Sequence, residues 1–295
     1  MTKTYRGRFA PTPSGPLHLG SLLTALASWL DARSRGGVWL LRIDDLDRAR
    51  CPRGAGSEIL RQLEAHGLQW DERPRYQSQH IAEYREALER LERDGRLYAC
   101  TCSRAVLKES CRPGPDDPVY PGTCREAGRG GRASRRVRLE DGTLCFDDAG
   151  QLRQCRRLAD EVGDFVVRRA DGQYAYQLAC AVDESAQAIS DVVRGADLLG
   201  STFRQLWLMC ALGLPAPRYR HLPVVVSADG RKLSKQNRAP PVTPRTAAAN
   251  LRRCLRLLHQ PDVEAGASAE ILRVAAAQWD AARVSRSAQI GDLPL

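Results

Sequence analysis

The segment APTPSGPLHLGS, residues 10–21, combines residue types that suit the binding of a phosphate group. Its three prolines fix backbone angles and lower the entropy cost of ordering a loop, while Gly15 and Gly20 let a ligand approach the main chain. A helix that begins here adds unpaired N–H groups and a partial positive charge, and the ring N–H of His18 can bond a phosphate oxygen. The segment matches neither common glycine-rich phosphate motif. A proline-rich turn with a capping histidine is the alternative interpretation.

A second segment, GRKLSKQN at residues 230–237, places two of the chain's few lysines three positions apart. Lys232 and Lys235 would lie on a short loop after the apolar run LPVVV, so their ammonium groups could move toward a ligand. Mobile cations of this kind stabilise the negative charge that develops on pyrophosphate. A solvated basic turn is the alternative for this segment considered alone.

The elements that position the first segment form a predicted βαβ unit. Residues 4–10 predict a short strand. Helical spacing of apolar side chains then follows in Leu19, Leu22, Leu23, Leu26, Ala27 and Leu30. After two glycines, VWLLRI at 38–43 is a continuous apolar run typical of a buried parallel strand, and the acidic run DDLD at 44–47 follows it. Because ligands bind at the carboxyl ends of parallel strands, the first segment and these carboxylates should face one crevice.

Coarser patterns organise the rest of the chain. Apolar spacing predicts helices near 59–63, 81–91 and 203–212, and a helical tail over 244–282. Strand-like segments are Val137–Leu139, Phe165–Val167, Tyr174–Leu178 and the run that begins at Leu222. Residues 98–131 are rich in Cys, Pro, Gly and Arg and poor in core-forming residues, which indicates an inserted subdomain.

The 295-residue chain has a net charge of +10 and a pI near 9.3, which favours a polyanionic partner such as nucleic acid or a nucleotide. The arginine preference of a GC-rich genome is the alternative explanation. The N-terminal residues lack the apolar core of a secretory signal, and no apolar run of about 18 residues predicts a membrane span. We therefore expect a cytoplasmic protein whose ten cysteines are reduced thiols or metal ligands.

Four of these cysteines fall within the inserted segment. Cys100, Cys102, Cys111 and Cys124 lie in a stretch rich in proline and glycine, and their spacing alone predicts a structural zinc site. Free thiols without a metal are the alternative. The other cysteines are dispersed, and we expect ordinary buried or surface thiols at Cys51, Cys145, Cys155, Cys180, Cys210 and Cys254.

The two phosphate-binding segments together resemble the paired signatures of the class I aminoacyl-tRNA synthetases. HLGS at 18–21 is similar to the HIGH element and KLSKQ at 232–236 to the KMSKS element, in the same order along the chain. The stretches RFAPTPSGPLHLGS, LLRIDDLD, YAYQLACAVDE, VVRGADLL and HLPVVVSADGRKLSKQN are similar to the glutamyl-tRNA synthetase branch. The resemblance covers residues 5–236. It is strongest to a truncated group of that branch, the glutamyl-queuosine tRNA(Asp) synthetases, because the chain leaves no room for an anticodon-binding domain.

The resemblance implies an α/β fold with a Rossmann-like, doubly wound parallel sheet. The catalytic nucleotide-binding domain would consist of two halves, 1–97 and 191–243, the second of which carries the KLSKQ loop. A zinc-binding insertion at 98–131 and a connective region at 132–190, which contributes to the amino-acid pocket, would separate them. Residues 244–295 would form a C-terminal helical tail.

The resemblance also implies roles for single residues. The glutamate site would comprise Arg8, Phe9, Ala10, Pro11, Thr12, Asp44, Tyr176 and Arg194. ATP would be bound by His18, Gly20 and Lys235, and the catalytic residues would be His18, Lys232 and Lys235. Arg8 would hold one substrate carboxylate through two hydrogen bonds and Arg194 the other, although Arg194 could instead pair with Asp197. Asp44 stands where the family usually has glutamate, so its contact with the substrate's amino group would need a shifted ligand or a bridging water.

The implied reaction joins glutamate and ATP, which carries Mg²⁺, to form glutamyl-adenylate. The glutamyl group would then pass to queuosine at the wobble position of tRNA(Asp), and the enzyme would be a cytoplasmic monomer. The resemblance implies one structural Zn²⁺ on Cys100, Cys102, Tyr120 and Cys124, with Tyr120 in place of Cys111. Three alternatives are a short glutamyl-tRNA synthetase that charges a 3′ end, a class I nucleotidyltransferase that uses no RNA, and a non-catalytic RNA-binding paralogue.

Overall fold

The computed structural model describes residues 4–127, 132–227, 232–233, 240–264 and 266–291. The chain begins with the predicted βαβ unit, in which the parallel strands β1 (Arg6–Phe9) and β2 (Val38–Ile43) are connected by helix α1 (Leu19–Arg33). Arg8 lies opposite Leu40 in the register, so both strands end at the same edge. The apolar residues that predicted α1 are all buried, which confirms that this face of the helix packs into the core.

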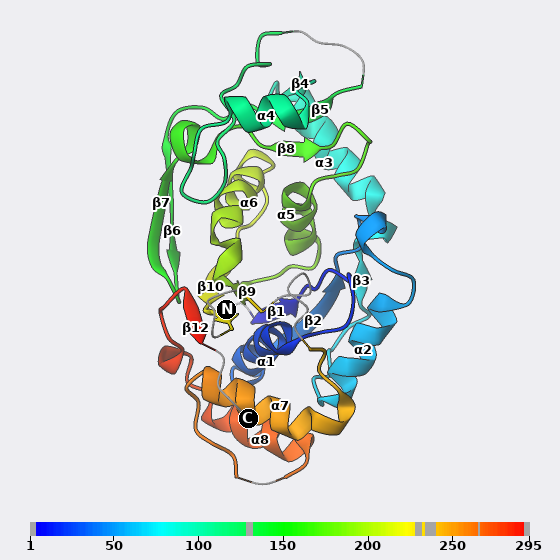
Figure 1. Ribbon diagram of the computed structural model, residues 1–295, viewed down its shortest axis with the longest axis vertical. Coiled ribbons are helices and arrows are strands. Elements are labelled where there is room, and N and C mark those ends of the chain that lie inside the picture. Colours follow the sequence, from blue (N-terminus) through cyan, green and yellow to red (C-terminus); the bar gives the residue numbers. More distant parts are fainter. Residues whose placement is uncertain (1–3, 128–131, 228–231, 234–239, 265, 292–295) are drawn as a thin grey trace.

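Further parallel strands extend this unit into an α/β fold. β3 (Arg75–Tyr76) pairs with β2, and β9 (Asp191–Gly195) pairs with β10 (Arg218–Leu222), each time in parallel. A hydrogen bond of 3.0 Å from the Ser190 N–H to the Arg6 carbonyl places β9 beside β1. The predicted α/β class with parallel strands is therefore confirmed (Figure 1).

Helices pack around these strands. In Figure 1, α5 (Tyr176–Ala186) and α6 (Leu199–Ala211) lie above β1 and β9, and α7 (Ala247–Leu257) and α8 (Ser268–Gln278) lie below α1. The remaining α-helices of the described chain are α2 (Ala55–Ala65), α3 (Ile81–Arg93) and α4 (Arg104–Ser110). The helical tail is confirmed as α7 and α8. None of the helices in the described ranges has both the length and the apolar character to cross a membrane.

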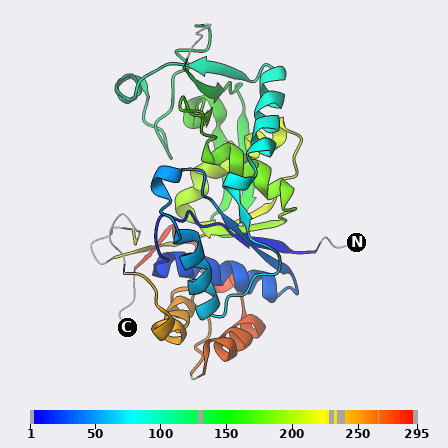
Figure 2. The same ribbon diagram turned by 90° about the vertical axis from the view of Figure 1, so that its right-hand side faces the viewer.

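Antiparallel strands form the end of the molecule that lies farthest from α7 and α8 (Figure 2). They are β4 (Leu97–Cys100), β5 (Ser134–Val137) and β8 (Val166–Arg168), in the order β4-β5-β8. A hairpin of β6 (Thr143–Asp148) and β7 (Leu152–Arg157) extends the sheet beyond β10. β11 (Val224–Val226) pairs with β12 (Gln289–Gly291).

The prediction of a strand over Tyr174–Leu178 is wrong, because helix α5 begins within this segment. Short apolar runs fit a buried helix as well as a buried strand, and spacing alone does not separate the two. Leu178, Ala181 and Val182 pack in a core that also receives apolar side chains from α3 and α6. Burial on several sides explains why this helix lacks a plain polar face.

The expectation of ordinary thiols at Cys145 and Cys155 is also wrong, because these two residues form a disulfide. They lie directly opposite each other on β6 and β7, with Cα atoms 4.2 Å apart. Side chains at opposite positions of an antiparallel pair are close enough to be bridged. The pairing depends on the register of a hairpin, which dispersed cysteines in a sequence do not reveal.

Candidate active site

The carboxyl ends of β1 and β9 open onto a cavity of about 490 Å³. Its wall contains the predicted site residues Arg8, Phe9, Ala10, Pro11, Thr12, His18, Gly20, Tyr176, Arg194 and Lys232. Both segments with phosphate-binding character therefore contribute to one cavity, although they are far apart in the sequence. Neighbouring parallel strands end at the same edge of the sheet, which is the physical reason for this meeting.

His18 is the N-cap of α1 and is only 8% exposed. Its Nδ1 accepts a hydrogen bond of 3.3 Å from the Ser21 N–H, so a neutral ring carries its proton on Nε2. This Nε2 lies 3.0 Å from Ser21 Oγ, and its N–H can donate to an anionic oxygen in the cavity. Gly20 leaves room for the ring, because a Cβ there would lie 3.3 Å from two of its atoms. The capping and ligand-binding interpretations of His18 are compatible.

The chain that follows the lysine segment is fixed to the loop before α1. Gln62 of α2 accepts a hydrogen bond of 2.7 Å from the Leu17 N–H and donates one of 2.9 Å to the Val242 carbonyl. The Val242 N–H donates to the Leu17 carbonyl at 2.9 Å. One buried amide side chain therefore connects the loop before α1 to Val242, downstream of the lysine segment.

Lys232 enters the cavity with its Nζ 2.6 Å from Asp197 Oδ2. Asp197 is therefore a partner of Lys232, and no ion pair among the described residues joins it to Arg194, which was the alternative that the sequence allowed. Lys235, the second predicted lysine, lies outside the described residues.

Arg194, at the end of β9, is only 3% exposed and is held by three side chains. Its Nη1 donates to Gln205 Oε1 at 2.8 Å, its Nη2 to Thr202 Oγ1 at 2.8 Å, and its Nε to His221 Nε2 at 3.1 Å. A guanidinium bonded at all three nitrogens has a fixed direction. Arg194 therefore presents a preoriented positive charge in the cavity wall.

Asp148 fixes the histidine that orients Arg194. Asp148 Oδ2 lies 2.6 Å from His221 Nδ1, and burial lowers the pKa of His221, so the imidazole is neutral. Burial alone would raise the pKa of Asp148, but hydrogen bonds from His221 lower it to about 2. The neutral ring donates from Nδ1 to this carboxylate and accepts from Arg194 at Nε2.

Arg8 lines the same cavity with one edge already bound to Glu184 of α5. Arg8 Nε and Nη2 lie 3.0 and 2.9 Å from Glu184 Oε1. Burial would raise the pKa of Glu184, but Arg8 and Arg42 outweigh it and lower the pKa to about 2. The two donors Nε and Nη2 of Arg8 therefore already bond Glu184, so this edge of the guanidinium cannot form the two predicted hydrogen bonds with a substrate carboxylate. Its Nη1 makes only a long contact of 3.5 Å with the Val193 carbonyl.

Asp44 is buried, with Oδ1 2.7 Å from Arg42 Nε. Arg42 Nη1 also lies 3.3 Å from Glu184 Oε1, and its Nε lies 3.7 Å from Asp183 Oδ2. Burial raises the pKa of Asp44 to about 6, even though Arg42 acts in the opposite direction. Asp44 is not among the described residues that line the cavity, and its carboxylate is bonded to Arg42.

A charge array, buried except at Arg75, therefore adjoins the cavity through Arg8. Its members are the cations Arg8, Arg42 and Arg75 and the anions Asp44, Asp183 and Glu184. Arg75 Nε bonds Asp183 Oδ1 at 2.8 Å, and the hydroxyl of Tyr84 donates to the same oxygen at 2.9 Å. Each buried ion has an oppositely charged partner, which makes its burial tolerable. Arg75 is partly exposed and also pairs with Glu83.

Sequence reasoning missed the residues that orient the cavity wall: Glu184, Asp183, Asp148, His221 and Gln62. Part of the signal was present, since Tyr176, Cys180 and Glu184 fall at positions i, i+4 and i+8 and share one face of a helix. The mistaken strand over Tyr174–Leu178 hid this spacing. No local pattern marks Asp148 or Gln62, because their partners are distant in the sequence.

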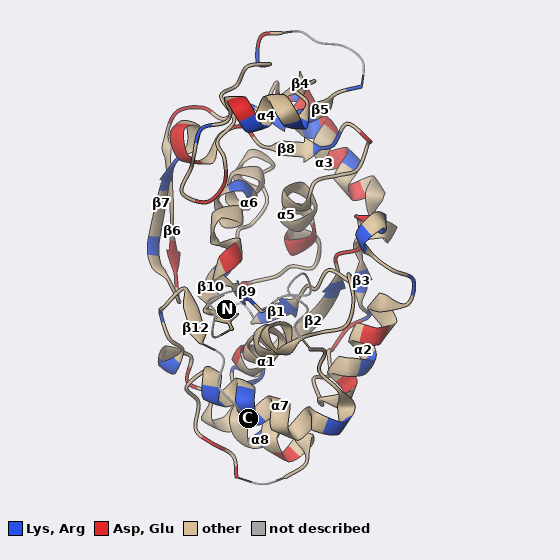
Figure 3. Cartoon of the chain, in the orientation of Figure 1, with Lys and Arg blue, Asp and Glu red and all other residues tan. Residues whose placement is uncertain are grey.

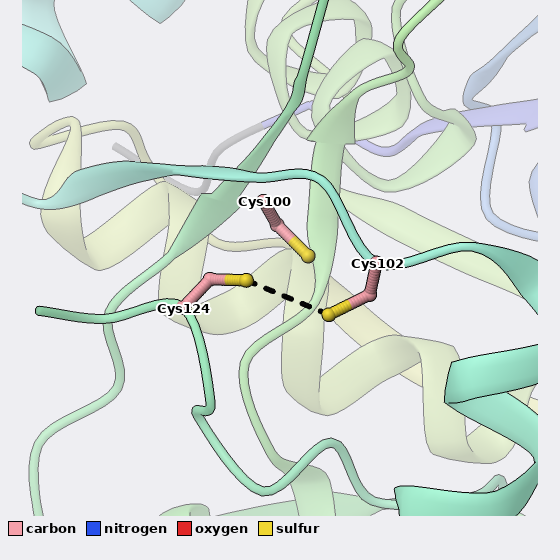
Figure 4. A group of neighbouring side chains, drawn as sticks. All are labelled: Cys100, Cys102 and Cys124. Carbon is pink, nitrogen blue, oxygen red and sulfur yellow. Dashed lines mark hydrogen bonds between the residues drawn. The ribbon is translucent and has the colours of Figure 1, made fainter. Parts of the chain in front are cut away.

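A second constellation lies in the inserted segment, where Cys100, Cys102 and Cys124 point toward a common centre (Figure 4). Their sulfur atoms all lie within 4.8 Å of one another, and those of Cys102 and Cys124 are 3.5 Å apart. Burial would raise the pKa of Cys100, but hydrogen bonds, first of all the one between its thiol and the Tyr120 hydroxyl, lower it to about 7. Three converging thiols are a possible metal-binding site.

Tyr120 joins this group and Cys111 does not. The Tyr120 hydroxyl lies 3.5 Å from the sulfur atoms of both Cys100 and Cys102 and accepts a hydrogen bond of 3.0 Å from the Cys124 N–H. Cys111 packs against the edge of the cluster, outside the group of converging sulfur atoms in the described chain. The arrangement agrees with the set that the resemblance implied rather than with cysteine spacing alone.

Comparisons with known proteins agree with this geometry. A family model described as tRNA synthetases class I (E and Q), catalytic domain, matches residues 4–248. A protein of Chromobacterium violaceum named glutamyl-Q tRNA(Asp) synthetase is 51% identical over 284 residues, which cover 95% of each chain. One of Cupriavidus metallidurans with the same name is 56% identical over 247 residues, or 81% of this chain and 79% of the relative.

Solved structures show the same fold. A glutamate-tRNA synthetase from Elizabethkingia anophelis has a TM-score of 0.80 at 23% identity and covers 97% of this chain, which spans 67% of that protein. A glutamate tRNA ligase from Elizabethkingia meningosepticum, in complex with its amino acid, has a TM-score of 0.82 at 22% identity and covers 99% and 67% of the two chains. From the model match and the sequence identities together, the chain belongs to the class I tRNA synthetases and, within them, to the family of the glutamyl-Q tRNA(Asp) synthetases.

Proposed function

We propose that this protein joins glutamate and ATP to form glutamyl-adenylate and pyrophosphate, and then transfers the glutamyl group to queuosine at the wobble position of tRNA(Asp). The observation that carries the proposal is the 51% identity to a glutamyl-Q tRNA(Asp) synthetase over 95% of both chains. The cavity adds support, because its wall unites the two arginines and the two segments on which the predicted chemistry rests.

Activation requires an in-line attack of a glutamate carboxylate oxygen on the α-phosphorus of ATP, with pyrophosphate as the leaving group. No side chain needs to form a covalent bond, so catalysis consists of positioning and charge stabilisation. In our proposal, the His18 N–H and the Lys232 ammonium bind phosphate oxygens, together with Lys235 and with Mg²⁺ that arrives with ATP. In the second step a hydroxyl of the RNA attacks the acyl carbon, and AMP leaves.

Arg194 is the proposed anchor for the substrate side chain. It is already oriented by His221, Thr202 and Gln205, so binding a carboxylate would cost little ordering of the guanidinium. Arg8 would assist through Nη1 alone, since Glu184 occupies its other edge. Two cations around one small ligand favour a dicarboxylic acid such as glutamate over the amide glutamine.

For the thiol cluster we propose one structural Zn²⁺ on Cys100, Cys102, Cys124 and Tyr120. Three sulfur atoms and a phenol oxygen lie close together, and four such ligands would suit a tetrahedral zinc ion. The guanidinium of Arg136 lies 4.0 Å from the centroid of the Tyr120 ring and would offset the excess negative charge of such a site. The bound ion would stabilise the fold of the insertion and would take no part in the reaction. The cytoplasmic location, the monomeric state and the domain boundaries that the resemblance implies stay predictions.

The test uses purified protein with labelled glutamate, ATP and tRNA(Asp) that carries or lacks queuosine. We expect label on the RNA only when queuosine is present, and we expect it to remain after the 3′-terminal nucleotide has been removed. Loss of label together with the 3′ end would instead establish a short glutamyl-tRNA synthetase. Pyrophosphate exchange that depends on glutamate but never labels RNA would establish a nucleotidyltransferase without an RNA substrate.

A further inference from the structure

Three arginines between β2 and α2 form a basic patch, which we define as Arg48, Arg50 and Arg53. All three side chains are exposed, and none makes an ion pair or side-chain hydrogen bond with a residue of the described chain. Arg48 and Arg50 lie on one short 3-10 turn, and Arg53 follows it before α2 begins. Figure 3 shows blue segments along this connection.

The lack of partners is notable because acidic residues are adjacent in the sequence. Each of those carboxylates is engaged elsewhere. Asp44 bonds Arg42, Asp45 accepts hydrogen bonds of 2.8 and 2.6 Å from the N–H and hydroxyl of Ser78, and Asp47 lies 3.8 Å from Arg169. The patch therefore keeps its full positive charge for a ligand from outside.

The basic patch also links the active-site cavity to a second one of about 240 Å³. Arg50 lines the first cavity and Arg48 the second; similarly, Ser14 lines the first and Pro13 the second. Residues two positions apart are separated by at most about 7 Å, so the two cavities are direct neighbours. Tyr76, which is partly exposed, also lines the second cavity.

We propose that the basic patch and the second cavity bind the nucleotide next to the acceptor nucleotide of the RNA substrate. Arg48 and Arg53 would neutralise its phosphodiester groups, and the base would stack on Tyr76. Cations beside an aromatic ring are the usual platform for single-stranded RNA, and an anticodon loop is single-stranded. The inference rests on the proposed function for the identity of the RNA, but the binding surface can be tested separately.

The variant Arg48→Ala/Arg53→Ala tests the patch without touching the active-site wall. We expect the KM for tRNA(Asp) in glutamyl transfer to rise about 10-fold. The salt dependence of binding should weaken by about 1.4 in the slope of log K against log salt, or about 0.7 for each phosphate group that is no longer neutralised. Pyrophosphate exchange without RNA should keep its rate, because no ligand of the adenylate reaction is removed.

Arg85→Ala/Arg93→Ala is the matched control, since it removes the same charge from exposed, unpaired arginines of α3. An equal loss in this control, or an unchanged KM and salt slope in the patch variant, would overturn the inference. Tyr76→Leu should raise the KM for tRNA(Asp) without changing the salt slope, and Tyr76→Phe should restore it. If wild-type protein transfers no glutamate to tRNA(Asp), the proposed function fails; salt-dependent binding of the isolated anticodon stem-loop then still decides for or against the patch.

Discussion

At the scale of single residues, hydrogen-bond direction decides how Arg194 faces the cavity. Asp148 Oδ1 accepts three main-chain N–H groups, at 2.8 Å from Gly150, 2.7 Å from Gln151 and 3.0 Å from His221. Its other oxygen receives the proton of the His221 ring. An asparagine at this position would keep its oxygen on the main chain and turn its NH₂ group toward the ring.

Asp148→Asn should therefore force the other tautomer on His221, with an N–H that faces Arg194. We expect the KM for glutamate in pyrophosphate exchange to rise about 10-fold, because the Nε2–H of His221 would then face the Nε–H of Arg194, and two buried donors cannot bond each other. The KM for ATP should stay nearly constant. Asp147→Asn is the control, since this neighbouring carboxylate is exposed and its loss changes the charge equally. A parallel rise of both KM values in Asp148→Asn would indicate general loosening of the fold.

Asp44 predicts a pH dependence. Its raised pKa of about 6 means that the carboxyl group is neutral below that pH and ionised above it. Only the carboxylate can attract the amino group of glutamate, directly or through water, so kcat/KM for glutamate should fall as the pH drops through 6. The variant Asp44→Asn should have a low kcat/KM for glutamate that does not change as the pH passes through 6. The ratio of variant to wild-type kcat/KM, measured across the pH range, cancels the titration of groups that the two proteins share; a constant ratio would contradict the prediction.

How far the sequence predicts the site depends on where each residue's partners lie. The cavity wall was predictable because Arg8 to Gly20 and Lys232 belong to short motifs whose chemistry is local. Glu184, Asp148 and Gln62 were not, since each acts through partners brought close only by the tertiary fold. The same limit applies to the disulfide between Cys145 and Cys155, whose pairing follows from a hairpin register.

At the scale of elements, the inserted segment has little apolar material to hold it. Its buried cluster consists of Tyr98, Cys100, Tyr120 and Cys124, and α4 contributes no buried residue. Such a small core gives little stability by itself. The strands β5 and β8 were partly predictable from apolar runs, whereas β4 was not predicted, and the convergence of the thiols depends on how these strands fold back.

Cys124→Ser should therefore release the metal from the insertion and make residues 98–131 sensitive to protease. Metal analysis should find one zinc ion per wild-type chain and much less in the variant. Cys111→Ser is the matched control and should keep its zinc, because Cys111 lies at the edge of the cluster. Equal loss of zinc from both variants would show that Cys111 is a ligand instead of Tyr120.

At the scale of the whole molecule, the active-site cavity lies between two apolar cores. Phe9 and Leu17 of the wall belong to the core of α1, α7 and α8, and Tyr176 of the wall begins α5, whose apolar side chains pack in the other core. The α/β class and the helical tail were predictable from apolar spacing. The contact between the two cores was not, because it joins strands that are distant in the sequence.

A ligand that spans the cavity should stabilise the fold more than one that fills half of it. We expect a non-hydrolysable glutamyl-adenylate analogue, at 100 times its Kd, to add about 2.7 kcal/mol to the free energy of unfolding and to raise Tm. Glutamate and ATP at the same concentrations should each raise Tm less, since each binds more weakly. Thermal melts of wild type and Arg194→Ala check this; equal shifts in the two proteins would contradict the proposed anchor.

The buried charge array also constrains how sequences of this kind can diverge. Arg8 and Arg42 are buried with Asp44, Asp183 and Glu184, and the partly exposed Arg75 pairs with Asp183, so neutralising one buried member leaves an opposite charge without its partner. Change at these positions should therefore be inherited in pairs, with the loss of a cation matched by the loss of an anion. An attempt to change the enzyme's amino-acid specificity by substitutions in this array would need to replace a cation and an anion together, so that each step keeps the net charge of the array constant.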